Sequence, residues 1–118
     1  MRQGRINRRV AGARLAGLAG IALLPLAHGA PAAETVEIAI QDYKFTPALL
    51  TVKAGTTVKW TNREKRTTHS VLFSGPGGFE SERFFPGESW QRTFDTPGSY
   101  PYSCGPHPEM KGAIVVTG

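Results

Sequence analysis

Over residues 34–118 the sequence predicts an all-β domain, an antiparallel sandwich or barrel of about seven or eight strands. Short segments in which apolar and polar residues alternate recur along this region. Turn residues, mostly Gly and Pro, separate these segments every eight to twelve residues or so, which is typical of antiparallel sandwiches and barrels. No stretch keeps an apolar period of 3.6 residues long enough to predict a helix.

Three strands are predicted in the first half of this region. Residues 36–40 alternate apolar and polar side chains, so one face of the strand can be buried. Residues 50–53 alternate in the same way and end before Gly55, a turn residue. Residues 57–61 follow directly, with Val, Trp and Thr residues that favour strands.

Four further strands are predicted in the second half. Residues 70–73 precede a Gly- and Pro-rich turn, and residues 89–94 and 99–104 each follow a Pro-Gly pair. Residues 113–116 form a final β-branched run. Residues 79–85 fit a strand, a helical turn or a packed loop, so their structure is left open.

Residues 1–33 predict an export signal that is removed. A positively charged start is followed by a short Ala-, Gly- and Leu-rich run at residues 15–26 and then by small residues. That run is too short to span a membrane, so we expect no span in the mature chain, although a retained membrane anchor is the alternative. The pair Arg8-Arg9 suits a twin-arginine signal as well as an ordinary Sec signal. The sequence therefore predicts a periplasmic protein.

The net charge of +5 comes from this leader. With histidine counted as neutral, its charged side chains are five arginines, Arg2, Arg5, Arg8, Arg9 and Arg14, whereas residues 34–118 hold nine basic and nine acidic residues. The mature chain is therefore near neutral and has no basic patch interleaved with aromatic residues. We expect no nucleic-acid binding.

Four side chains in the mature region suggest a metal site. His69 and His107 are its only histidines, Cys104 is its only cysteine and Met110 is its only methionine. Cys104, His107 and Met110 have the spacing C-x2-H-x2-M. Two imidazoles and a thiolate in a plane, with a weak axial thioether, are the ligands of a blue-copper centre. A bound metal would also protect an unpaired thiol in an oxidising compartment.

Three of the four candidate ligands also have a plainer interpretation. Cys104 could be a buried inert thiol, Met110 a side chain that fills the core, and His69, which lies 35 residues before Cys104, a structural histidine. A zinc site is a further alternative for one cysteine and two histidines, although a methionine at this spacing favours copper.

Two prolines flank the second histidine. Pro106 and Pro108 fix two φ angles and remove two N–H donors from the loop that carries the ligands. We therefore expect a stiff loop with few amides free to bond the thiolate of Cys104. Fewer hydrogen bonds to that sulfur should lower the reduction potential.

Three stretches carry a resemblance to a known family: Trp60-Thr61-Asn62-Arg63-Glu64, the series Phe94, Pro97-Gly98, Tyr100, Tyr102, Cys104, His107-Pro108 and Met110, and the closing run Lys111-Gly112-Ala113-Ile114-Val115-Val116. Over residues 35–118 the chain resembles the cupredoxins, and within them the plastocyanin/amicyanin group, amicyanin in particular. The resemblance implies a Greek-key β-sandwich that binds one type 1 copper ion through His69, Cys104, His107 and Met110. It also implies that His107 is the electron port and that the amide of Asn62 ties the ligand loops together.

The chain departs from the amicyanin pattern in two places. The interval from Asn62 to His69 is one residue longer, with Thr68 where the family has a proline. Glu109 stands where amicyanin has an aromatic residue beside the exposed ligand. The second departure puts a carboxylate on the expected docking face, so amicyanin's amine-dehydrogenase partner is not assumed here.

The function that these features predict is single-electron transfer, with no catalysis by the chain itself. We expect a monomer that docks weakly near His107 with a periplasmic dehydrogenase or a c-type cytochrome. A periplasmic copper carrier or storage protein is the alternative, but that class usually has exposed Met- and His-rich tracts, which this mature chain lacks. An enzyme would need a second metal centre with further histidines.

Overall fold

The computed structural model describes residues 33–118, so residues 1–32 of the predicted export signal lie outside it. The described part contains eight strands: β1 (Thr35–Gln41), β2 (Lys44–Thr46), β3 (Leu49–Lys53), β4 (Thr56–Asn62), β5 (Leu72–Phe73), β6 (Ser89–Phe94), β7 (Gly98–Ser103) and β8 (Lys111–Thr117). Within residues 33–118, no helix has the length and apolar character needed to cross a membrane.

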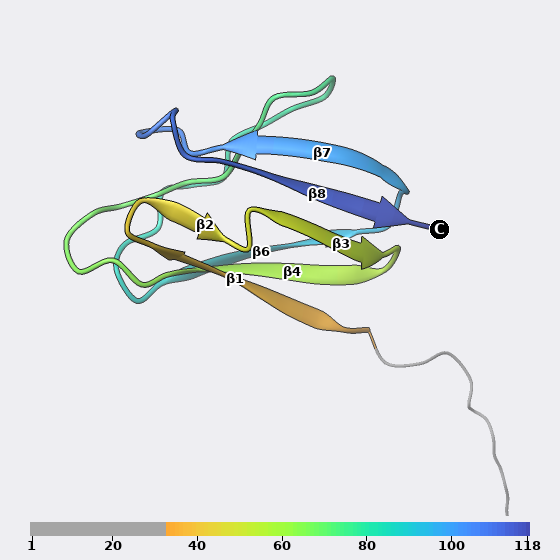
Figure 1. The fold of residues 1–118 in the computed structure, drawn as a ribbon, viewed down its shortest axis with the longest axis horizontal. Helices are drawn as coiled ribbons and strands as arrows, with labels where there is room; N and C mark the ends of the chain where they lie inside the picture. The colour runs from red at the N-terminus through yellow and green to blue at the C-terminus, as the bar shows by residue number, and fades with distance from the viewer. Residues whose placement is uncertain (1–32) are drawn as a thin grey trace, which may run out of the picture. The chain divides into compact units, whose positions relative to one another are not determined.

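The strands form two four-stranded sheets that pack face to face, one in the order β2-β1-β4-β6 and the other in the order β3-β8-β7-β5 (Figure 1). The predicted all-β sandwich is confirmed. Both sheets are mixed rather than purely antiparallel, because β1 pairs with β4 and β3 pairs with β8 in parallel. The chain changes sheet after each strand from β2 to β6, so each parallel pair joins strands that are not consecutive in the sequence.

All seven strands predicted from the sequence are present, and the structure adds β2. This strand of three residues forms a hairpin with β1 through Asp42 and Tyr43, both of which have positive φ (55° and 57°). Two-residue hairpin turns of this kind usually contain Asn-Gly or Asp-Gly. The pair Asp-Tyr gave no such signal, so the hairpin was not predicted.

The segment between β5 and β6 is a packed loop without a regular strand. Two isolated bridges attach it to the preceding chain, one between His69 and Phe84 and one between Leu72 and Glu80. The hydroxyl of Ser81 accepts a hydrogen bond from the backbone N–H of Val71 (2.9 Å). These contacts resolve the open prediction for residues 79–85 as a loop held against the strand that follows His69.

The core is centred on Trp60, which points inward from β4 and is fully buried. Its ring packs edge-on against Phe73 and Tyr102 of the opposite sheet, with centroids 6.2 and 5.4 Å away. Truncating such a side chain to Ala costs about 3–5 kcal/mol of stability.

The Tyr100 hydroxyl donates to the backbone carbonyl of Thr96 (2.6 Å), the kind of bond found in a tyrosine corner. The contacts of Trp60 and Tyr100 thus hold the two sheets in place.

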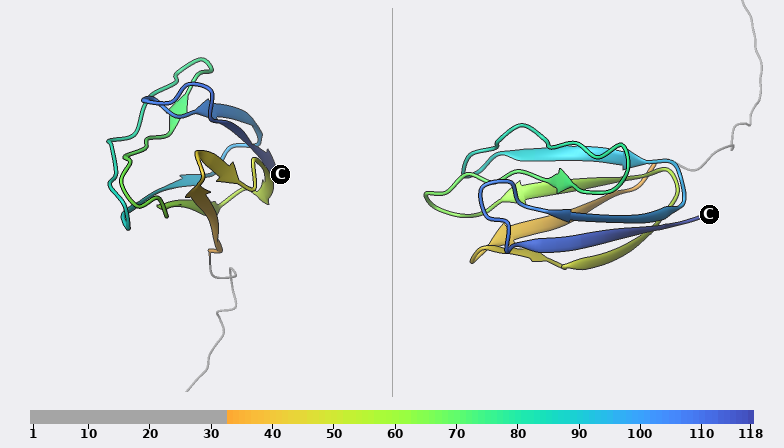
Figure 2. Two further views of the ribbon diagram at one scale, coloured as in Figure 1. Left: turned by 60° about the vertical axis from the view of Figure 1, so that its left-hand side comes forward. Right: turned by 90° about the horizontal axis from the view of Figure 1, so that it is seen from above.

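Three connections meet at one end of the sandwich, at the left of Figure 1 and opposite the C-terminus. They are the β1–β2 turn, the β4–β5 connection (residues 63–71) and the β7–β8 loop (residues 104–110). Figure 2 shows them gathered at the same end when the sandwich is turned. The parallel pairing of β1 with β4, and the antiparallel pairing of β7 with β8, place these strand ends together.

Candidate metal centre

The side chains of His69, Cys104 and His107 converge at this end of the sandwich. One ligand atom from each, a ring nitrogen or the sulfur, lies within 4.8 Å of the other two. The Sγ atom of Cys104 is 3.5 Å from Nδ1 of His69 and 3.6 Å from Nδ1 of His107. Residues up to 38 positions apart in the sequence thus present two nitrogens and one sulfur to a common point.

His69 is fully buried at the start of the segment that leads into β5. Its backbone is fixed against Phe84, and each residue's N–H donates to the other's carbonyl (3.2 and 3.0 Å). While Nδ1 faces the sulfur, Nε2 lies 3.2 Å from Oε2 of Glu64. Burial lowers the pKa of His69, so the imidazole is neutral at pH 7 and has the form that binds metals.

Cys104 follows β7 and is also fully buried. Its sulfur accepts a hydrogen bond from the backbone N–H of Ser70 (3.5 Å). Burial raises the pKa of the Cys104 thiol, and the Ser70 bond only partly opposes this. The thiol without metal is therefore protonated at pH 7, and metal binding must release its proton.

His107 and Met110 lie in the β7–β8 loop, which the backbone closes on itself. The N–H of Met110 donates to the carbonyl of His107 (2.9 Å), and the N–H of Cys104 donates to the carbonyl of Met110 (3.1 Å). Met110 is buried, whereas His107 is partly exposed. The loop therefore ties three of the predicted ligands together and leaves His107 partly open to solvent.

Three further residues were predicted near the site: Asn62, Pro106 and Pro108. The side-chain amide of Asn62 donates to the carbonyls of Thr67 (2.8 Å) and Phe84 (3.1 Å), on either side of His69. Pro106 and Pro108 flank His107 in the loop, where neither has an N–H to offer. Asn62 thus braces the segment that carries His69; among the described residues its side chain makes no bond to the β7–β8 loop, so it does not tie the two ligand loops together as the resemblance implied.

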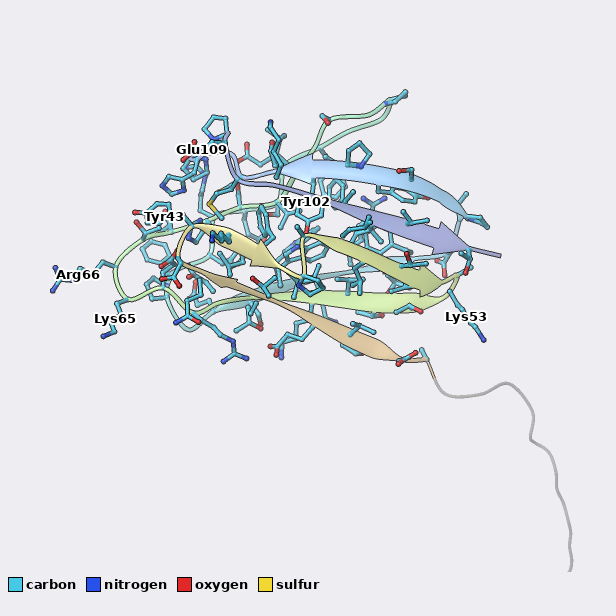
Figure 3. All side chains as sticks on the ribbon, viewed as in Figure 1. Tyr43, Lys53, Lys65, Arg66, Tyr102 and Glu109 are labelled. Atoms are coloured by element: carbon cyan, nitrogen blue, oxygen red, sulfur yellow. The ribbon has the colours of Figure 1, made fainter. Side chains whose placement is uncertain are left out.

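Sequence reasoning missed Tyr43, which lies beside both histidines. Its ring packs edge-on against His107 (centroids 4.9 Å apart) and against His69 (5.8 Å). Its N–H donates to Oε2 of Glu64 (2.8 Å), and its hydroxyl is 3.1 Å from Oγ1 of Thr67. Figure 3 shows Tyr43 at the same end of the molecule as Glu109. No local motif marks Tyr43, because the β1–β2 turn brings it there only in the folded chain.

Glu64, Ser70 and Glu80 were missed as well. Glu64 appeared within the motif that precedes His69, and a carboxylate a few residues before a metal-binding histidine is a usable signal, because such histidines commonly bond a carboxylate through their second nitrogen. Ser70 and Glu80 gave no signal. The Ser70 hydroxyl donates a hydrogen bond to Oε2 of Glu80 (2.6 Å), and these two residues meet only in the folded protein.

The donor set decides which metals fit. One thiolate, two imidazoles and a nearby thioether are soft or intermediate donors, which suit copper and zinc and do not suit magnesium or calcium. The buried sulfur and the rigid backbone around it leave little room for a change of geometry. Such a site suits a metal that changes its charge by one electron without rearranging its ligands.

Comparison with known proteins gives a consistent result. Residues 14–116 match the family model described as a cupredoxin-like domain. The chain is 42% identical over 91 residues to amicyanin-alpha of Methylorubrum extorquens, an alignment that covers 74% of this chain and 75% of the relative. The fold is similar to the crystal structure of amicyanin from Paracoccus versutus (TM-score 0.67, 33% identity), with coverage of 75% of this chain and 86% of that one.

One similar structure belongs to an enzyme. The copper-containing nitrite reductase of Thermus scotoductus matches with a TM-score of 0.67 and 32% identity. The match covers 80% of this chain but only 25% of the reductase. This chain therefore corresponds to about a quarter of that protein.

Proposed function

This chain belongs to the cupredoxin-like family, and from that premise we propose that it is a blue-copper protein that carries single electrons between redox partners in the periplasm. One copper ion is held by His69, Cys104, His107 and Met110. The observation that carries the proposal is the convergence of the Cys104 sulfur with Nδ1 of both histidines. Bound copper supplies the Cu(I)/Cu(II) couple, which is the only redox chemistry that the function requires.

The surrounding residues keep the site rigid through that cycle. His69 is fixed by Glu64 and by its backbone bonds to Phe84, and Cys104 by the Ser70 N–H. Because the ligands are held by the sandwich itself, they move little when the charge of the centre changes. A small rearrangement keeps the barrier to electron transfer low.

His107 is the proposed electron port. It is partly exposed between Tyr43, Pro106 and Pro108, which together give the port an apolar rim. A periplasmic dehydrogenase or a c-type cytochrome would dock here through a small, transient interface. The protein acts as a monomer, residues 34–118 form the mature domain, and residues 1–33 direct export.

A periplasmic copper carrier or storage protein is the alternative within the same site. A carrier must give up its metal readily, whereas here His69 and Cys104 are fully buried and Met110 nearly so. Slow release of copper to a chelator favours electron transfer, and rapid release favours the carrier.

Catalysis by this chain alone is not proposed, despite the similarity to a quarter of a nitrite reductase. A reaction on a substrate needs an open metal position or a second centre. Residues 33–118 contain no histidine besides His69 and His107, and the ligands proposed here complete one site.

The test is the visible spectrum of the protein after addition of Cu(II). We expect an intense blue band from charge transfer between the Cys104 thiolate and copper, bleached by ascorbate and restored by ferricyanide. The variant Cys104→Ala should lose the band. A colourless wild-type protein, or one that reduces its own copper without a donor, would overturn the electron-transfer proposal in favour of the carrier or of zinc.

A further inference from the structure

A chain of hydrogen bonds leads from the Cys104 loop to the protein surface. The backbone N–H of Gly105 donates to Oγ of Ser70 (3.0 Å), and the Ser70 hydroxyl donates to Oε2 of Glu80 (2.6 Å). The same carboxylate oxygen lies 3.5 Å from Nε of Arg83. Glu80 is thus connected to the peptide that follows Cys104, although it lies 24 residues earlier in the sequence.

Ser70 contacts the Cys104 region twice. Its N–H donates to the Cys104 sulfur (3.5 Å), and its hydroxyl oxygen accepts the N–H of Gly105. A hydroxyl can rotate, so a buried serine needs a partner to fix its direction. The Glu80 carboxylate is that partner, because it accepts the hydrogen bond of the Ser70 O–H and so leaves the hydroxyl lone pairs facing Gly105.

The residue at position 105 fits this arrangement. A Cβ atom at Gly105 would overlap Oε2 of Glu80 and would lie 2.7 Å from Oγ of Ser70. Glu80 and Ser70 therefore occupy the space that any other residue at position 105 would fill. Gly105 allows a carboxylate to approach the ligand loop closely.

The charge of Glu80 also acts on the sulfur. Its carboxylate is separated from the Gly105 N–H, next to Cys104, by a single serine hydroxyl, so its negative charge lies close to the metal position, with the Arg83 guanidinium beside it as a partial counter-charge. The side chain of Glu80 is about one-third exposed (35%), so water screens this effect only in part. A negative charge near a metal centre favours the more highly charged metal state, here Cu(II).

We propose that Glu80 is a positioning residue of the copper centre, which acts through Ser70 to hold the Cys104–Gly105 peptide and which lowers the reduction potential by its charge. With Ser70 held in this way, the Gly105 N–H bonds a hydroxyl oxygen instead of the thiolate. The sulfur still accepts the hydrogen bond from the Ser70 N–H. This inference rests on the proposed copper function.

Three variants separate the charge from the hydrogen bond. Glu80→Gln removes the charge but keeps an oxygen that can accept the Ser70 proton, whereas Glu80→Ala removes both. Glu82→Gln is the matched control, because Glu82 is an exposed carboxylate two residues away whose side chain makes no hydrogen bond or ion pair with the site among the described residues. The readouts are the redox equilibrium with ferrocyanide and ferricyanide, and amide hydrogen exchange at Gly105 in the apo and Cu(I) proteins.

For Glu80→Gln we expect the equilibrium to shift toward Cu(I) by at least about threefold, which is about 28 mV at 59 mV per tenfold change. Gly105 exchange should stay within about twofold of the wild type. For Glu80→Ala we expect the same shift or more, together with exchange at least about tenfold faster, since the Ser70 hydroxyl is no longer fixed. Ser70→Ala should reproduce the faster exchange, and Glu82→Gln should change neither readout.

The proposal is overturned if Glu80→Gln matches Glu82→Gln in the redox equilibrium, or if Glu80→Ala leaves Gly105 exchange unchanged. A loss of thermal stability alone, with both readouts unchanged, would also overturn it. If Glu80→Ala does not fold, the Glu80→Gln equilibrium and the Ser70→Ala exchange decide. If the wild-type protein forms no blue centre, the proposed function fails, and Gly105 exchange in the apoprotein still shows whether Glu80 positions the loop.

Discussion

The Nε2 atom of His69 lies 3.2 Å from Oε2 of Glu64, while Nδ1 of the same ring faces the Cys104 sulfur at 3.5 Å. The two ring nitrogens therefore have separate roles. A carboxylate on Nε2 holds the proton there and leaves the Nδ1 lone pair directed at the metal position. Because Oε2 of Glu64 also accepts the N–H of Tyr43, the ring is oriented by a group that is itself fixed.

Removing that carboxylate should weaken metal binding. We expect Glu64→Ala to lower the Cu(I) affinity by about 10- to 100-fold, as loss of a carboxylate behind a ligating histidine typically does. Glu64→Gln keeps an acceptor oxygen and should lie between the wild type and Glu64→Ala. The measurement is competition with a Cu(I) chelator, with Glu82→Gln as control. An affinity of Glu64→Ala within threefold of the wild type would mean that the His69 ring is oriented by packing alone.

The apoprotein should lose stability in mild acid because of His69. Burial lowers the pKa of His69 in the folded state, and Glu64 only partly opposes this. The unfolded chain, with an ordinary pKa of about 6.5, therefore binds the proton more readily. At pH values well above the pKa of the unfolded chain, His69 leaves the free energy of unfolding unchanged. As the pH falls through that pKa, the free energy of unfolding decreases, until His69 of the folded protein also takes up a proton.

Urea unfolding of the apoprotein at several pH values measures this effect. Between roughly pH 7.5 and 5.5 we expect the free energy of unfolding to fall by up to about 1.4 kcal/mol per pH unit. His69→Asn should flatten the slope whatever its effect on stability at neutral pH. An equal slope in His69→Asn and in the wild type would assign the acid sensitivity to other groups.

The parts of the structure that the sequence predicted are those set by local patterns. Strand β4 was predicted because Val58 and Trp60 alternate with polar residues, and the buried face follows that alternation. Cys104, His107 and Met110 were predicted as a group because a short loop must keep them together. His69 was reached only by elimination, since nothing in its neighbourhood distinguishes a ligand from a structural histidine.

What was not predicted depends on contacts between distant segments. The hairpin at Tyr43 needs two non-glycine residues at positive φ, which a bond from its N–H to Glu64 helps to hold. Glu80 reaches Gly105 only because the β5–β6 connection folds back along the chain after His69. No spacing rule relates a glutamate to a glycine 25 residues later, so these contacts can be seen only in the folded protein.

Replacing Pro106 should raise the reduction potential. Pro106 has no N–H, so position 106 cannot donate to the Cys104 sulfur two residues before it. Pro106→Ala restores that donor, and a further hydrogen bond to the thiolate stabilises Cu(I). The midpoint potential from a redox titration should rise. Pro108→Ala is the control, because its new N–H lies beyond His107. An unchanged potential in Pro106→Ala would mean that the restored N–H does not reach the sulfur.

Electron transfer through the port should respond to two cations at the same end of the molecule. Lys65 and Arg66 are exposed on the β4–β5 connection, and Figure 3 shows them projecting from the same end as Tyr43, whereas Lys53 lies at the opposite end. Neither Lys65 nor Arg66 forms an ion pair among the described residues. Because residues 34–118 have equal numbers of basic and acidic residues, any steering must come from such local charge.

We expect Lys65→Glu and Arg66→Glu each to slow oxidation of the Cu(I) protein by ferricyanide roughly twofold or more at an ionic strength of about 0.1 M. The Debye length is then about 10 Å, so charges near the port act on the anion while distant ones are screened. Lys53→Glu makes the same change of net charge far from the port and should leave the rate nearly unchanged. A cationic oxidant, tris(phenanthroline)cobalt(III), should show the opposite trend. Equal slowing by Lys53→Glu and Lys65→Glu would show that only total charge matters and that electrons do not leave through the end of the molecule that carries His107.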